Sequence, residues 1–198
     1  MSHSHVHESS AGASNRVKAL VAAFEAANVF TERDLDAFIE AYLGSAQPAN
    51  GAVLVARAWV DEAFRARLLA DGNAAAAELG FDLARWAPVK LRVVANAPGR
   101  HNLIVCTLCS CYPLALLGPS PSWYKSNAYR SRAVRDPRGI LAEFGTELPD
   151  DTEITVWDST AEVRYMVLPQ RPAGTDNASE EELRALVTRN GMIGTALV

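Results

Sequence analysis

The spacing of the apolar residues changes near residue 89 of this 198-residue chain. In the segment 31–43 they recur every three or four positions, which is typical of an amphipathic helix. From residue 89 onward they alternate along the chain, as in Val89, Leu91 and Val93, which is typical of a strand. The sequence therefore predicts an α+β fold, in which an N-terminal helical arm is followed by a layered α-β-β-α domain.

These patterns divide the chain into three regions. Residues 1–14 are small and polar, so we expect a disordered tail. The tail carries three alternating histidines, His3, His5 and His7. They are either solvated or transient ligands of a divalent metal. Residues 15–85 carry short helices with broad apolar faces and form the predicted arm. Residues 86–198, with four predicted strands, form the predicted catalytic domain.

Charge and composition argue against several classes of partner. The net charge is −4, the pI is near 5.6 and no basic block occurs, so we expect no binding to nucleic acid. No apolar run approaches the length of a membrane span, and the N-terminal "MSHSHVHESS" lacks the apolar core of a signal peptide, so we expect no membrane association. The expected location is the cytoplasm, where thiols stay reduced.

All three cysteines of the chain lie within "VCTLCSCY", residues 105–112. A structural zinc ion needs four ligands, and the only nearby histidine, His101, precedes the cluster. A disulfide between Cys106 and Cys109 would leave Cys111 unpaired, in a compartment that disfavours disulfides. Three inert buried thiols are the remaining alternative. The clustering favours metal chemistry, with these alternatives left open.

The spacing of the last two cysteines permits a different kind of metal site. If the sulfurs of Cys109 and Cys111 bind one ion, the amide nitrogens of Ser110 and Cys111 lie between them and, once deprotonated, complete a planar S, N, N, S donor set. Cys106 can then reach an axial position and leave the opposite side open. Such anionic donors suit a trivalent low-spin cobalt or iron ion, and the open position would permit Lewis-acid catalysis.

The stretch "VCTLCSCYP" resembles the metal-claw motif of the nitrile hydratase α subunit. The resemblance covers most of residues 50–198 and continues through "LLG", "SWYK", "YRSRAVRDPRGILAEFG", "VWDSTAEVRYMVLPQRPAGT" and "SEEELRALVTRNGMIG". In that family, threonine after the first claw cysteine marks the cobalt enzymes and serine marks the iron enzymes. Thr107 therefore implies cobalt.

The resemblance also implies a role for each claw residue. Cys106 would be the unmodified axial thiolate, Cys109 a sulfinate and Cys111 a sulfenate. The amide nitrogens of Ser110 and Cys111 would complete the donor set around one cobalt(III) per chain. The implied activity is hydration of a nitrile to an amide, with attack by the sulfenate oxygen of Cys111 or by a hydroxide that the ion activates.

Partner subunits are implied as well. In that family, arginines of a β subunit pair the oxidised sulfurs, so we expect a β subunit, in one chain or split into two, and an activator protein that loads cobalt. Asp158 and Arg164 match family positions near the site and the subunit boundary. The other local candidates for pairing the oxidised sulfurs are Arg130, Arg132 and Arg135. When isolated, the chain can form a homodimer through the surface that β would cover.

One departure from the family pattern concerns the substrate. Where the family usually has tryptophan, this chain has Leu114, which opens space and favours a bulky neutral nitrile, such as the nucleoside nitrile toyocamycin. The related thiocyanate hydrolase γ subunit typically carries an arginine there, which suits an anion. The alternatives are therefore a thiocyanate hydrolase-like subunit and a non-catalytic cobalt-binding α chain that needs partner subunits for activity.

Overall fold

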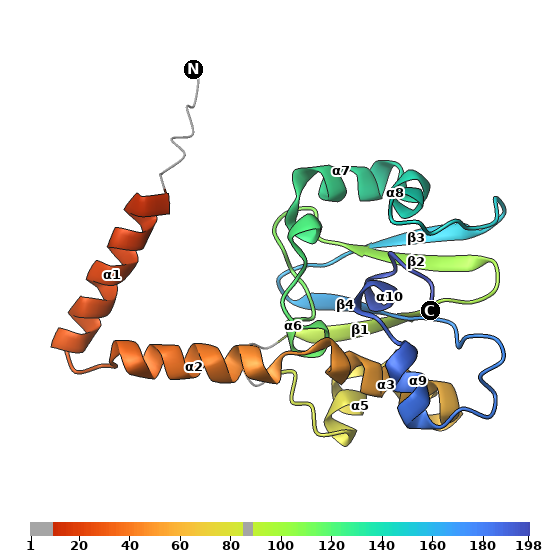
Figure 1. Ribbon diagram of the computed structural model, residues 1–198, viewed down its shortest axis with the longest axis horizontal. Helices are drawn as coiled ribbons and strands as arrows, with labels where there is room; N and C mark the ends of the chain where they lie inside the picture. Colours follow the sequence, from red (N-terminus) through yellow and green to blue (C-terminus); the bar gives the residue numbers. More distant parts are fainter. Residues whose placement is uncertain (1–9, 85–88) are drawn as a thin grey trace, which may run out of the picture. The chain divides into compact units, whose positions relative to one another are not determined.

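The computed structural model describes residues 10–84 and 89–198. Contacts within the chain divide it into two units, residues 1–45 and 46–198, and each is described by itself. The described part of the first unit consists of the helices α1 (Ser10–Ala26) and α2 (Glu32–Ser45) (Figure 1).

Thr31 and Asp34 define the start of α2. The Thr31 hydroxyl accepts a hydrogen bond from the Asp34 amide, and the Asp34 carboxylate accepts one of 2.9 Å from the Thr31 amide. The hydrogen bonds from Thr31 lower the pKa of the Asp34 carboxyl below its ordinary value. This reciprocal pair satisfies amide donors that a helix leaves unpaired in its first turn.

The first helix begins earlier than the sequence pattern indicated. Residues 10–14, which we assigned to the disordered tail, belong to α1. This short segment contains two alanines and no proline, so it can extend the apolar helix that follows it. The three tail histidines lie outside the described residues.

Three helices of the predicted arm belong to the second unit: α3 (Pro48–Val60), α4 (Glu62–Ala70) and α5 (Gly72–Glu78). The helices α4 and α5 pack against the strand β1 (Lys90–Ala95). Their buried side chains share one core with those of α3 and the strand: Leu54, Phe64, Leu68, Ala75, Leu91 and Val93. The division therefore falls at residue 45 rather than 85, because burial against the strands, which local sequence does not reveal, joins these helices to the second unit.

The strands of the described chain pair in parallel, β1 with β4 (Val163–Leu168) and β2 (Arg100–Val105) with β3 (Glu153–Asp158) (Figure 1). They coincide with the predicted strands. Because β2 and β3 run in the same direction, their carboxyl ends meet, and Val105 lies opposite Asp158. The cysteine loop leaves the fold at this end.

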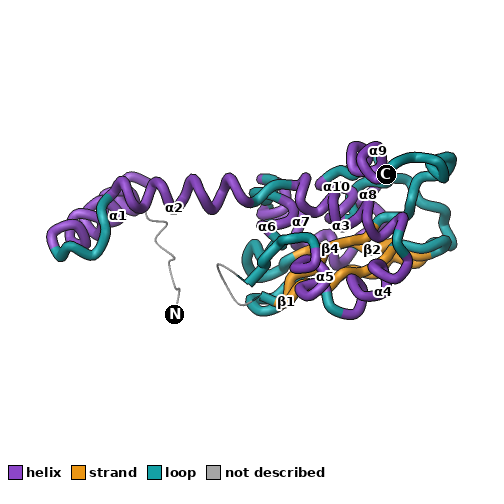
Figure 2. Tube along the Cα trace, turned by 90° about the horizontal axis from the view of Figure 1, so that it is seen from below, coloured by secondary structure: helices purple, strands orange, loops and turns teal. Residues whose placement is uncertain are grey.

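The remaining helices follow β2 and β4 in the chain, and in Figure 2 those that are labelled lie on the side of the strands away from α4 and α5. They are α6 (Leu114–Leu117), the 3-10 helix Ser122–Lys125, α7 (Asn127–Arg135), α8 (Pro137–Glu143), α9 (Glu180–Leu186) and α10 (Arg189–Ile193). Helix α7 packs against β2, α8 against β3 and α10 against β4. The predicted α+β class is confirmed. No helix in the described part of the chain is long and apolar enough to cross a membrane.

Candidate metal centre

The cysteine loop begins where β2 ends. Cys106 directly follows the last residue of β2 and is buried, with 1% of its surface exposed. The chain then turns outward, so that Cys109 is exposed and Cys111 is half-buried. The loop is thus anchored in the core at its first cysteine and open to solvent at its second.

The structure brings the three sulfurs together. All lie within 4.8 Å of one another, with 3.4 Å between the sulfurs of Cys106 and Cys109 and 2.9 Å between those of Cys109 and Cys111. All three are free cysteines, which disfavours the disulfide alternative. No fourth side-chain ligand joins the cluster among the described residues, and His101 instead bonds to the carbonyl of Gly194 at 2.7 Å, which disfavours structural zinc.

Backbone amides face the same cluster. Hydrogen bonds from the thiols of Cys111 and Cys106, and then from the amides of Cys111 and Ser110, lower the pKa of the Cys109 thiol to about 7. Burial, followed by the hydrogen bond with Cys109, raises the pKa of the Cys111 thiol to about 12. The amides of Ser110 and Cys111 therefore face the Cys109 sulfur, which is one of three clustered sulfurs in the same hexapeptide. Sulfur and amide nitrogen donors of this kind fit a metal ion that takes anionic ligands.

The first turn of the loop is tied to the neighbouring strand. The Thr107 amide donates to one carboxylate oxygen of Asp158 at 2.9 Å, and the Thr107 hydroxyl donates to the other at 2.6 Å. Asp158 is the last residue of β3, and the amide of the next residue, Ser159, donates to the Val105 carbonyl at 2.8 Å. The parallel pairing of β2 and β3 therefore positions this carboxylate beside the first turn of the cysteine loop.

Arg164 approaches the loop from β4. Its charge lowers the pKa of Cys111, against the larger effect of burial, which shows that the guanidinium lies near that sulfur. The same guanidinium donates to the carbonyl of Thr160. A supporting role for Arg164 stays a prediction.

Two other side chains bond to the backbone of the loop. Arg130, on α7, donates to the Cys109 carbonyl at 3.1 Å, and the fully buried Tyr124 donates to the Cys111 carbonyl at 3.0 Å. The sequence favours a structural or interface role for Arg130, with pairing to oxidised sulfur as the alternative, and does not mark Tyr124 as a site residue. Contacts to backbone carbonyls leave no spacing pattern in the sequence, so only the tertiary structure could identify them.

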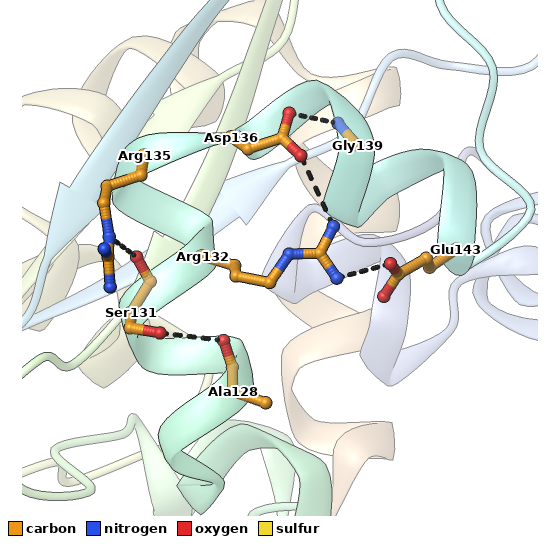
Figure 3. Close-up of polar contacts among 7 residues, drawn as sticks. All are labelled: Ala128, Ser131, Arg132, Arg135, Asp136, Gly139 and Glu143. Carbon is orange, nitrogen blue, oxygen red and sulfur yellow. Dashed lines mark hydrogen bonds and ion pairs between the residues drawn. The ribbon is translucent and has the colours of Figure 1, made fainter.

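The two other arginines of α7 lie in a different network. Arg132 forms ion pairs with Asp136 and Glu143, which link α7 to α8 (Figure 3). Arg135 donates to the Ser131 carbonyl on its own helix at 3.1 Å (Figure 3). Their bonds in the described chain support the helices rather than the sulfurs.

Leu114 lies at the start of α6 and is half-buried against the hydrophobic core. It follows Tyr112, a buried aromatic residue whose ring lies 5.1 Å from that of Tyr124. The Leu114 side chain packs against the core that contains these rings, and it carries no charge.

A loop of three cysteines and two inward-facing amides on the edge of a small α+β fold defines a claw-type metalloprotein. The sequence profile of the family described as "Nitrile hydratase, alpha chain" matches residues 11–196. This chain belongs to the nitrile hydratase α-chain family, which is an enzyme family.

Individual relatives agree with this assignment. The chain is 49% identical over 182 residues to the low-molecular weight cobalt-containing nitrile hydratase subunit alpha of Rhodococcus rhodochrous, covering 92% of this chain and 87% of that protein. It is 42% identical over 165 residues to the thiocyanate hydrolase subunit gamma of Thiobacillus thioparus, covering 79% and 68%.

A solved structure extends the comparison to the fold. A double mutant of the Fe-type nitrile hydratase from Comamonas testosteroni Ni1 is similar with a TM-score of 0.87 and 41% identity, covering 96% of this chain and 92% of that chain. Relatives that differ in metal and in substrate therefore share this fold, so neither the metal nor the substrate follows from the fold alone.

Proposed function

We propose that this chain is the α subunit of a cobalt nitrile hydratase, which adds water to a nitrile and releases the corresponding amide. The observation that carries the proposal is the convergence of three sulfurs and two backbone amides within residues 106–111. A disulfide or a zinc site requires no backbone amide at those positions. The proposed centre uses both the sulfurs and the amide nitrogens as ligands.

The proposed ligands are the sulfurs of Cys106, Cys109 and Cys111 and the amide nitrogens of Ser110 and Cys111, holding one cobalt(III) per chain. Deprotonated amides and thiolates are strong anionic donors, which suit a trivalent ion. When bound, the ion supplies Lewis acidity that polarises the nitrile. Thr107 and the similarity to a cobalt-containing relative support cobalt over iron.

The proposed oxidation states follow the exposure of the sulfurs. Cys109 is exposed and has a lowered pKa, which favours its oxidation by dioxygen to the sulfinate. Cys111 is half-buried and would stop at the sulfenate, and the buried Cys106 would stay a thiolate. In this state the oxygen on Cys111 is the proposed nucleophile toward the nitrile carbon, and water supplies the oxygen and protons that the amide gains.

The proposed substrate is a bulky neutral nitrile, for which a nucleoside nitrile such as toyocamycin is the example. Leu114 supports this choice because it is smaller than an indole and offers no charge to an anion. A thiocyanate hydrolase-like activity is the second candidate, and the similarity to a thiocyanate hydrolase γ subunit supports it. Activity assays with thiocyanate, which would release ammonia and carbonyl sulfide, separate the two.

The proposed partners are a β subunit, as one chain or two, and an activator protein that loads cobalt. The tip of the claw loop supports a partner, because 90% of the surface of Leu108 is exposed. A groove of about 450 Å³ lies next to the loop and is lined by Thr107, Asn127, Arg130, Ser131, Val134 and Arg135. Without its partners, the chain is expected to self-associate as a homodimer through this surface.

Coexpression with the β subunit and activator, followed by metal analysis and mass spectrometry of the claw peptide, tests the function. We expect about one cobalt per chain, two added oxygens on Cys109 and one on Cys111, and turnover of nitrile to amide. The Cys111→Ala variant is the matched control, because it keeps the fold but lacks one equatorial sulfur and the proposed nucleophile. Zinc in the wild-type claw, or cysteines without added oxygen in an active enzyme, would refute the proposal.

A further inference from the structure

Arg130 makes an unusual contact for a half-exposed arginine. One terminal nitrogen donates to the Cys109 carbonyl at 3.1 Å, and the other donates to the Asn127 side chain at 2.5 Å on the preceding turn of α7. Its third nitrogen, Nε, is buried without a hydrogen-bond partner in the described chain. No ion pair of Arg130 with a carboxylate occurs among the described residues, so its charge is directed at the claw loop.

The carbonyl that Arg130 contacts belongs to the peptide that supplies the Ser110 nitrogen. Because a peptide is planar and trans, its oxygen and its N–H point in opposite directions. A guanidinium that holds the Cys109 oxygen on the outer side therefore turns the Ser110 nitrogen inward.

Tyr124 holds the loop at a second point. Its hydroxyl donates to the Cys111 carbonyl at 3.0 Å, and its ring is fixed by an edge contact with Tyr112 at 5.1 Å. The amides of Ser110 and Cys111 thus lie between the carbonyls of Cys109 and Cys111. Arg130 bonds to the first carbonyl and Tyr124 to the second. The side chains differ in one respect: Tyr124 is neutral, whereas Arg130 is charged.

We propose that Arg130 is a positioning residue that pre-orients the Cys109–Ser110 peptide and offsets the negative charge of the claw. The inference rests on the proposed function and deepens it, because it names the residue of this chain that supports an amide ligand. A claw of anionic donors puts negative charge on the carbonyl oxygen of the same peptide, and a hydrogen bond from a guanidinium to such an oxygen is stronger than one to a neutral carbonyl. Arg130 is therefore expected to strengthen metal retention.

The test compares Arg130→Gln and Arg130→Lys in the complete, coexpressed enzyme. Arg132→Gln is the matched control, because it removes an arginine from the same helix whose bonds lead to α8 instead of the claw. The readouts are the rate of cobalt loss to a chelator, the cobalt–thiolate charge-transfer absorption, and the oxygens added to the claw peptide. Thermal unfolding of each metal-free chain separates changes in folding from changes at the claw.

We expect cobalt to be lost about 10- to 100-fold faster from Arg130→Gln, with a shifted charge-transfer band. Arg130→Lys should restore part of the retention because it keeps the charge but lacks the second donor that bonds Asn127. The Arg132→Gln control should retain cobalt at the wild-type rate. If a folded Arg130→Gln enzyme keeps the wild-type rate of cobalt loss and the wild-type absorption, the inference is overturned but the proposed function is not. Absence of cobalt from the wild-type enzyme would instead overturn the proposed function, and the inference with it.

Discussion

Thr107 and Asp158 are joined by two hydrogen bonds although 51 positions separate them in the chain. The Thr107 hydroxyl donates to one carboxylate oxygen at 2.6 Å and the Thr107 amide to the other at 2.9 Å. One residue begins the claw loop and the other ends β3, so this pair couples the loop to the parallel strand pair.

The Thr107→Val variant should weaken this coupling. It removes the hydroxyl bond but keeps the shape and the amide bond, so the free energy of unfolding should fall by about 1 kcal/mol. Cobalt content after expression should fall as well, because the loop is less well oriented. Chemical denaturation and metal analysis measure the two effects. Thr107→Ser, which keeps a hydroxyl, serves as the control for stability and should unfold like the wild type; equal losses of stability in both variants would contradict the role of the hydroxyl.

The thiols of the metal-free chain should differ in their pH dependence. The pKa of Cys109 is lowered to about 7, so its thiolate fraction, and with it its alkylation rate, should rise about tenfold per pH unit below that value and level off above it. The pKa of Cys111 is raised to about 12, so Cys111 should be alkylated more slowly than Cys109. Alkylation of a metal-free sample, followed by mass spectrometry of the claw peptide, measures both rates.

The Cys111→Ala variant is a direct check of that assignment. The hydrogen bond from Cys111 is the largest cause of the lowered pKa, so removing it should raise the pKa of Cys109 and move the plateau to higher pH. Faster alkylation of Cys111 than of Cys109 in the wild-type chain would contradict the assignment.

Replacing Gly194 with alanine should destabilise the second unit. Gly194 has a φ of 91°, and a Cβ at this position would collide with the carbonyl oxygen of Asn102 on β2. The combined strain and clash should lower the free energy of unfolding by about 2–4 kcal/mol, as urea denaturation would measure. In contrast, Gly99→Ala has a similar φ of 73° and open space, so it should cost only about 1–2 kcal/mol. Equal costs would exclude the close approach of Gly194 to β2 as the cause.

Leu114→Arg should change the choice of substrate. A guanidinium at the start of α6 favours an anion and disfavours a neutral nitrile. We expect the ratio of kcat/KM for thiocyanate to that for a neutral nitrile to rise at least about tenfold, which corresponds to about 1.4 kcal/mol. Leu114→Met is the control, because it keeps an uncharged side chain of similar volume. An unchanged ratio in Leu114→Arg would remove Leu114 from the substrate site.

The α+β class and the elements near the claw could be predicted from local patterns. The period-two alternation predicted the strand β1. The start of α9 is also local, because Ser179 and Glu182, three residues apart, form its capping box. The limits of the predicted arm could not be derived in this way. An apolar helix face looks the same in the sequence whether it packs in the core, as Leu54 does, or lies on α2, where no described residue is buried.

The sequence by itself determined the proposed donor set, because Cys106, Cys109, Ser110 and Cys111 lie in one hexapeptide and need no distant residue to come together. Only the tertiary structure decided how that loop is held. Asp158, Tyr124 and Arg130 come from three separate elements, and they reach the loop because parallel pairing and core packing bring those elements to the end of β2. Contacts within a short loop are limited by chain geometry alone, whereas contacts between distant segments depend on the burial that folds the whole unit.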